Sequence, residues 1–174
     1  MKTSRLFVGE SMEIFTVSFF GHRQVEDFAP VEERAERLVG ELITGKPYLE
    51  FLVGRNGEFD QMIASCLLRA KRKWRDDNNF LVLVLPYPTA EYRSNVSSFE
   101  SYYDEIEICG QAAGGHFKSA IQTRNRYMVD RSDLVVCYVK RPGGAYQTIC
   151  YAEQKRKAII NLAEGSGQSG WLPF

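Results

Sequence analysis

Short, continuously apolar runs alternate along this chain with longer stretches in which apolar residues recur every three or four positions. The runs have the length of buried strands, and the periodic stretches have the spacing of helices that bury one face. The pattern predicts strands at residues 14–20, 48–53, 80–85, 133–139 and 158–163. It predicts helices at 30–43, 59–70, 118–131 and 145–157.

Alternation of strand and helix is typical of a parallel sheet, because a helix returns the chain to the starting edge for the next strand. The run FLVLVL at 80–85 is apolar throughout, as expected for a strand covered on both faces. We therefore expect an α/β fold, with a Rossmann-like, doubly wound, mainly parallel sheet and helices on both faces. The segment 86–117 is less regular, and there we expect a short helix near 98–103 and a short strand near 105–109.

A length of 174 residues suits one domain, so we expect a single Rossmann-like domain over 1–174. Residues 1–12 are expected to form a flexible lead-in. Residues 164–174 are expected to form a C-terminal tail, rich in Gly and Ser, whose apolar end docks on the domain or on a partner.

Composition excludes several classes of protein. The 22 Lys and Arg residues balance 22 Asp and Glu residues, which argues against specific nucleic-acid binding. No apolar run approaches the roughly 20 residues of a membrane helix, and the apolar stretch at 12–20 lacks a signal-peptide cleavage site. The 4 cysteines form no CxxC pair and only 2 histidines are present, so zinc-ligand spacing is absent. We expect a cytoplasmic protein with reduced thiols, no bound metal and no cofactor.

Glycine-containing turns follow three of the predicted strands: Gly21-His22-Arg23, Gly54-Arg55-Asn56-Gly57 and Arg141-Pro142-Gly143-Gly144. The carboxyl ends of parallel strands lie at one edge of the sheet, where ligands bind. Glycines allow close approach of the backbone to a ligand, and helix N-termini favour anions. Each turn also carries an arginine suited to phosphate recognition. One such turn is ordinary, but the three together predict a phosphate-binding site.

Side chains near these turns have two interpretations. His22 is either a structural histidine or a ligand contact. Asp60, in the first turn of its helix, either stabilises the helix dipole or accepts a ligand hydroxyl. Gln147 and Thr148 lie in the first turn of the helix after the last glycine pair and are included as candidate contacts.

Arg124 and Asn125 lie between Ile121 and Met128 on the apolar face of their helix. Burying such groups without partners costs roughly several kcal/mol, so they either tie neighbouring loops together or face a ligand. The candidate ligand-binding residues are Gly21, His22, Arg23, Gly54, Arg55, Gly57, Asp60, Arg124, Asn125, Gly143, Gly144, Gln147 and Thr148.

Four segments carry a resemblance to a known family: FFGHR (19–23), VGRNGEFD (53–60), TRNRYMVDRSDLVV (123–136) and PGGAYQTICYAE (142–153). In order and spacing they resemble motifs of the SLOG superfamily (the SMF/DprA–LOG grouping), and within it the YpsA-like branch. The resemblance implies a Rossmann-like fold that binds nucleotides or nucleotide-derived ligands, often as a homodimer.

LOG enzymes of this superfamily cleave the N-glycosidic bond of nucleoside monophosphates, using a PGGxGTxxE motif and an upstream arginine. Arg124 matches that arginine, but Ile149 and Cys150 stand where the catalytic carboxylate is expected. Thr148 is displaced by one position and Glu153 lies nearly a turn further on. This departure argues against glycosidase activity.

We therefore expect a sensor or regulatory module that binds a nucleotide or a nucleotide-derived phosphate ligand. The alternative is a phosphoribohydrolase-like N-glycosidase in which Glu153 or Asp60 polarises water or ribose. A DNA-handling protein like DprA is a third class, against which the zero net charge counts.

Overall fold

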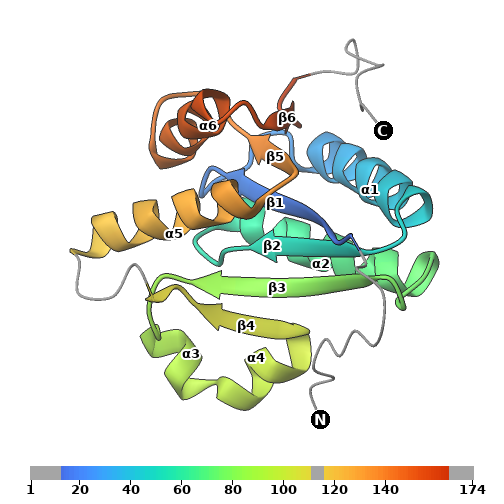
Figure 1. Cartoon of the computed structure of the whole chain (residues 1–174), viewed down its shortest axis with the longest axis horizontal. Helices are drawn as coiled ribbons and strands as arrows, with labels where there is room; N and C mark the ends of the chain where they lie inside the picture. Colours follow the sequence, from blue (N-terminus) through green and yellow to red (C-terminus); the bar gives the residue numbers. More distant parts are fainter. Residues whose placement is uncertain (1–12, 111–115, 165–174) are drawn as a thin grey trace.

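The computed structural model describes residues 13–110 and 116–164, which fold around one six-stranded sheet (Figure 1). The strand order is β4-β3-β2-β1-β5-β6, and every neighbouring pair is parallel. The strands are β1 (Phe15–Gly21), β2 (Leu49–Val53), β3 (Asn79–Leu85), β4 (Glu105–Ile108), β5 (Leu134–Tyr138) and β6 (Ala158–Asn161). The expected lead-in at 1–12 and all but the first residue of the expected tail lie outside the described residues.

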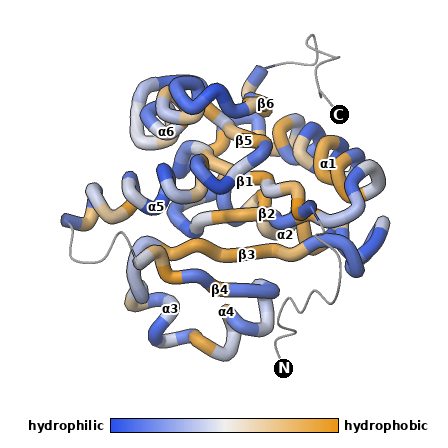
Figure 2. Tube along the Cα trace, viewed as in Figure 1, coloured by the Kyte–Doolittle hydropathy of each residue, from blue (hydrophilic) through white to orange (hydrophobic). Residues whose placement is uncertain are grey.

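Helices cover both faces of the sheet, so the Rossmann-like α/β expectation is confirmed. The larger core cluster joins α1 (Phe28–Gly45) and α2 (Glu58–Lys73) to one face, and the other joins α5 (Phe117–Arg131) and α6 (Gly144–Gln154) to the opposite face. Phe51 and Leu52 are adjacent on β2 and belong to different clusters, because successive side chains of a strand point to opposite faces. Burial on both sides is therefore the reason that the run 80–85 of β3 is apolar throughout, and β3 is coloured hydrophobic along most of its length in Figure 2.

The chain reverses its direction across the sheet at β1. From β1 it builds outward through β2, β3 and β4, and it then returns to the other side of β1 to form β5 and β6. In open parallel sheets such a reversal leaves a crevice beyond the carboxyl ends of the two diverging strands. The fold thus places the turns after β1 and β5 side by side.

The irregular segment contains one element that the sequence analysis missed. The helix and strand expected there are present as α4 (Val96–Tyr102) and β4, but a further short helix, α3 (Ala90–Ser94), precedes them. Thr89 caps it by accepting the N–H of Tyr92 at 3.2 Å. A helix of 5 residues is too short to show an apolar period, so the cap was its only signal.

Helix α6 ends at Gln154, earlier than expected, and Arg156 adopts a left-handed conformation with φ of 56° that turns the chain into β6. Among the described helices, none combines the length and the apolar character that crossing a membrane requires.

Candidate functional site: a cavity at the reversal point of the sheet

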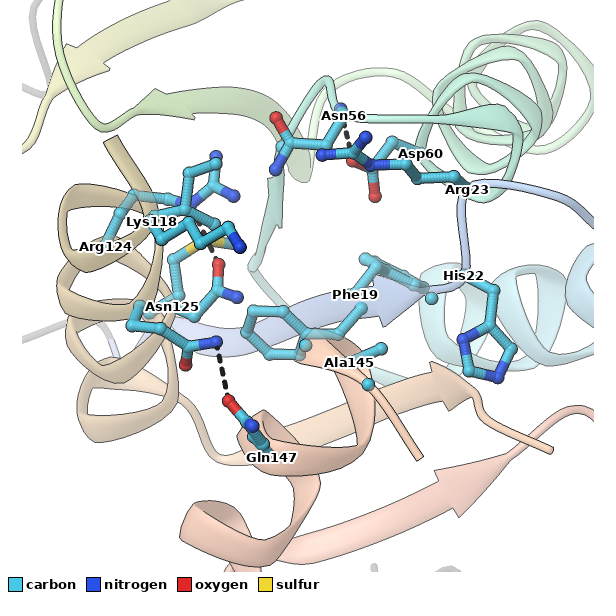
Figure 3. A pocket seen from close by; sticks show the side chains of 18 of the residues that line it. Phe19, His22, Arg23, Asn56, Asp60, Lys118, Arg124, Asn125, Ala145 and Gln147 are labelled. Atoms are coloured by element: carbon cyan, nitrogen blue, oxygen red, sulfur yellow. Dashed lines mark hydrogen bonds between the residues drawn. The ribbon is translucent and has the colours of Figure 1, made fainter. Parts of the chain in front are cut away.

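A cavity of about 550 Å³ lies at the carboxyl edge of the sheet, beside the reversal point (Figure 3). Its walls come from the end of β1, the β2–α2 turn, one face of α5 and the first turn of α6. A volume of this size is typical of a small-molecule site. The predicted residues that line it are Gly21, His22, Arg23, Gly54, Asp60, Arg124, Asn125, Gly143, Gly144 and Gln147.

The other three candidates lie outside the cavity wall. Arg55 donates to Glu91 Oε1 at 2.8 and 3.0 Å and to the Tyr103 hydroxyl at 3.1 Å, so its charge is committed to α3 and α4. Thr148 is a buried residue of α6, and Gly57 packs against the backbone of Arg23. The expected convergence of three arginines is also not found, because Arg141 pairs with Glu26 at 3.3 Å.

The glycines of the predicted site have different roles. A Cβ on Gly21 would lie 2.2 Å from Cγ of Phe59, and one on Gly57 would lie 2.4 Å from the Arg23 Cα, so both are needed for packing. A Cβ on Gly54 would lie 3.0 Å from Arg124 Nη1 and 3.2 Å from Asp60 Oδ2. A Cβ on Gly144 would meet its first contact, Gln122 Nε2, at 3.7 Å, which is ordinary space, and no atom lies within 4 Å of a Cβ on Gly143, where the φ of 152° strains any side chain.

Gly21→Ala is expected to destabilise the fold, because Phe59 is fully buried and stacks on Tyr138 with ring centroids 6.1 Å apart. Overpacking of this kind costs about 1–3 kcal/mol of unfolding free energy. Urea denaturation measures the loss. Gly45→Ala is the matched control, since no atom lies within 4 Å of a Cβ there. Equal stability of the two variants would contradict the packing role.

The N-terminus of α6 presents backbone N–H groups to the cavity. Its N-cap is Gly143, which supplies no capping side chain, and its first turn contains no acidic residue. Gly143 has φ of 152°, a conformation that L-residues rarely adopt, and Gly144 and Ala145 line the cavity. The unpaired N–H groups and the positive end of the helix dipole favour an anion at this position.

The N-terminus of α2, on the opposite wall, is already neutralised by its own carboxylates. Glu58 Oε2 accepts the N–H of Val25 at 2.6 Å, and Asp60 Oδ2 accepts the N–H of Asn56 at 2.8 Å. A phosphate placed there would meet the carboxyl group of Asp60, which lines the cavity, whereas Glu58 does not line it. The cavity therefore has an anion-binding wall at α6 and an acceptor-rich wall at α2.

Arg124 is 2% exposed and lies on the cavity wall from α5. Its Nε donates to Asn125 Oδ1 at 2.9 Å, and its Nη1 donates to the Val84 carbonyl at 3.0 Å. Asn125 Nδ2 in turn donates to Thr148 Oγ1 at 3.0 Å, which links α5 to α6. Both interpretations of Arg124 and Asn125 thus have support. The two side chains tie α5 to β3 and α6, and the guanidinium, which has five N–H groups, retains donors for a ligand.

Asp60 is buried on the α2 wall, close to Arg124. Burial raises the pKa of Asp60, although the Asn56 N–H and the Arg124 charge oppose the rise. Burial lowers the pKa of Arg124, and Asp60 opposes that change. A carboxyl group in this state is shifted toward its protonated form, in which it donates as well as accepts a hydrogen bond.

Helix α5 supplies cavity residues that the sequence analysis did not include. Lys118, Ile121 and Gln122 line the cavity with Arg124 and Asn125, and Gln122 Nε2 donates to Gln147 Oε1 at 3.1 Å (Figure 3). Extending the helical period backward from Asn125 would have found Lys118 and Gln122. The remaining lining residues outside the prediction are Phe19, Phe20, Asn56, Phe117, Met128 and Ala145.

The positions of Glu153 and Asp60 bear on the N-glycosidase alternative, which needs a carboxylate in the cavity. Glu153, one candidate for polarising water or ribose, is exposed on α6 and is not part of the cavity wall. Asp60, the other candidate, lines the cavity. Among the described residues, no group of three or more His, Cys, Asp and Glu side chains is arranged to hold a metal ion.

No family model and no curated protein matches the chain. Its structure is similar to that of DNA processing protein A (DprA) from Helicobacter pylori, described for its single-stranded DNA binding mode, with a TM-score of 0.61 and 15% identity over 88% of this chain. DprA from Streptococcus pneumoniae gives a TM-score of 0.60 and 16% identity over 84% of this chain. The matches span 67% and 49% of those chains. The Rossmann-like fold implied by the resemblance is therefore confirmed and is shared with DprA, and the YpsA-like branch stays a prediction.

Proposed function

We propose that this chain binds a nucleotide or a nucleotide-derived phosphate ligand in the cavity at the reversal point, as a sensor or regulatory module. One observation carries the proposal. The uncapped, acid-free N-terminus of α6 faces the same cavity as the buried guanidinium of Arg124. Helix N-termini and arginines both recognise phosphate, the first through free backbone N–H groups and the second through bidentate hydrogen bonds.

The two walls of the cavity suggest an orientation for the ligand. The phosphate lies at Gly144 and Ala145, in the cavity that the α5 cation Lys118 also lines. The sugar hydroxyls lie toward Asp60 and Asn56, because carboxylates bind ribose hydroxyls in many Rossmann-like sites. Phe117, which is 52% exposed on the cavity wall, offers a ring for stacking with a base.

The four sequence motifs support placing the chain in the YpsA-like branch of the SLOG superfamily, and with that resemblance we expect a cytoplasmic homodimer. Analytical ultracentrifugation of the full chain tests the oligomeric state. A DprA-like role in DNA handling is less favoured, because the chain has no net charge and spans only part of the DprA proteins.

Thermal unfolding with AMP, ribose 5-phosphate and adenosine tests the proposal. A ligand at 100 times its Kd adds roughly 2.7 kcal/mol of stability. We expect AMP and ribose 5-phosphate to stabilise the protein and adenosine, the control without phosphate, to have little effect. Equal stabilisation by adenosine, or none by any of the three, would overturn the proposal.

Chromatography of the AMP incubation separates binding from hydrolysis. We expect no release of free adenine, because no carboxylate on α6 occupies the expected catalytic position and Glu153 is exposed. Steady release of base that is lost in Asp60→Asn would instead establish the N-glycosidase alternative.

A further inference from the structure

His22 links the two turns that meet at the reversal point of the sheet. It follows β1 directly, is 8% exposed, and its backbone N–H donates to the Tyr138 carbonyl at 3.3 Å. Its Nε2 accepts the backbone N–H of Lys140 at 2.9 Å. A backbone N–H can only donate, so Nε2 carries no proton and the ring is neutral in this arrangement.

The turn held by His22 is the one that leads to the anion-binding wall. Lys140 follows β5, and three residues later the chain reaches Gly143, the N-cap of α6. The ring of His22 also packs edge-on against Tyr138, with centroids 5.7 Å apart and an interplanar angle of 82°. His22 thereby fixes the start of the segment whose end positions the N–H groups of Gly144 and Ala145.

Other contacts across the same junction differ from this hydrogen bond in charge and exposure. The Tyr138 hydroxyl accepts the N–H of Glu26 and donates to its carbonyl, at 3.0 and 3.1 Å. Lys140 pairs with Asp27 at 3.2 Å, and Arg141 pairs with Glu26 at 3.3 Å. The ion pairs are solvent-exposed and contribute little. The His22 bond is the link across this junction whose acceptor is removed when an imidazole is protonated at mildly acidic pH.

We propose that His22 is a positioning residue, and that its unprotonated Nε2 holds the β5–α6 turn so that anion binding at α6 is stronger when the imidazole is neutral. Protonation at Nε2 replaces the acceptor with a donor that opposes the Lys140 N–H, and the turn is released. The inference rests on the proposed anion site and adds its regulation by pH.

Burial and the charges around His22 decide in which direction its pKa shifts, and so how anion affinity depends on pH. Burial, followed by the cation of Arg141, lowers the pKa of His22 from the ordinary value of 6.5, while the carboxylate of Glu26 opposes the change. Lys140 and Asp27 are the other charged groups at the junction. The neutral ring therefore dominates at pH 7. Anion affinity should fall as the pH drops through the lowered pKa, because release of the turn outweighs the attraction of the imidazolium charge that protonation adds to the cavity wall. The stability of the fold should fall from about pH 6.5 downward.

Sulfate is a suitable probe, because its charge does not change between pH 5 and 8, whereas the second pKa of a phosphate ester is about 6. Its affinity is measured by NMR titration across this range in the wild type, His22→Gln and His116→Gln. The glutamine introduced by His22→Gln offers its Oε1 as an acceptor that does not titrate. His116, the only other histidine, is exposed at the start of α5 and serves as the matched control.

We expect wild-type sulfate affinity to fall roughly two- to tenfold on acidification, the effect of losing one hydrogen bond. The midpoint should coincide with the titration of the His22 ring and with the shift of the Lys140 amide resonance. The fall should persist in His116→Gln and disappear in His22→Gln.

Two results separate the possible failures. If sulfate binds but His22→Gln keeps the pH dependence, or the Lys140 amide ignores the His22 titration, the positioning role is wrong and the anion site stands. If sulfate binds at no pH while the Lys140 amide follows His22, the anion site itself is wrong, and the regulation proposed for it falls with it.

Discussion

Arg124→Lys is expected to weaken nucleotide binding by roughly 1.5–3 kcal/mol, the range for hydrogen bonds to charged groups. The guanidinium is planar and presents its donors in a fixed fork, so it can bond a phosphate or ribose oxygen while keeping its partners in the protein. A lysine ammonium at this depth has one nitrogen in place of three. It cannot contact Val84, Asn125 and a ligand in the same directions.

The structure indicates that Arg124→Lys also lowers the stability of the protein without ligand. The wild-type guanidinium donates to the Val84 carbonyl and to Asn125 Oδ1, and the lysine satisfies at most one of these buried acceptors well. We expect a loss of about 1 kcal/mol in the unfolding free energy of the ligand-free protein. The loss in binding should exceed this loss in stability.

Arg126→Lys is the matched control. Arg126 lies two residues further along α5, is exposed, and has its guanidinium over the ring of Tyr151. Calorimetric titration with AMP and urea denaturation measure the two quantities on both variants. A large fall in the stability of Arg124→Lys with unchanged AMP affinity would assign Arg124 to the scaffold alone.

The sequence predicted the fold because the central strands leave little ambiguity. Side chains such as Leu81 and Val82 of β3 must both be buried, since helices cover both faces, and that requirement makes the run 80–85 apolar at every position. Arg124 and Asn125 could be found for the complementary reason. A polar side chain on an apolar stripe needs a partner, and the structure supplies Val84 and Thr148.

The site was less predictable where a side chain's direction depends on distant segments. Arg55 follows β2 in the same way as Arg23 follows β1, yet Glu91 and Tyr103 draw it away from the cavity. These partners lie 36 and 48 residues further along the chain, so a local pattern does not reveal them.

The glycines illustrate the same limit. Gly21 and Gly144 both look suited to a ligand in the sequence. The buried ring of Phe59 fills the space beside Gly21, whereas the space beside Gly144 is open to the cavity. Tertiary packing therefore decides which glycine makes room for a ligand and which makes room for a side chain.

The open space beside Gly144 leads to the second prediction with a large expected effect. Gly144→Val is expected to lower AMP affinity by at least about a hundredfold, or roughly 2.7 kcal/mol, while the fold stays largely intact. A Cβ at this position would make only an ordinary contact, 3.7 Å from Gln122 Nε2, and Gly144 is the first residue of α6. The valine methyl groups would occupy the space in which a phosphate approaches the N–H groups of Gly144 and Ala145.

Gly45→Val is the matched control for this variant. Gly45 ends α1, is not part of the cavity wall, and has no atom within 4 Å of a Cβ. Circular dichroism and urea denaturation establish folding, and calorimetric titration with AMP measures the affinity of each variant. Because the substitution adds bulk without removing a charge or a hydrogen-bonding side chain, a loss confined to Gly144→Val would place the phosphate at the α6 N-terminus. A folded Gly144→Val protein that binds AMP like the wild type would remove this turn from the site and leave Arg124 and Asp60 as its remaining anchors.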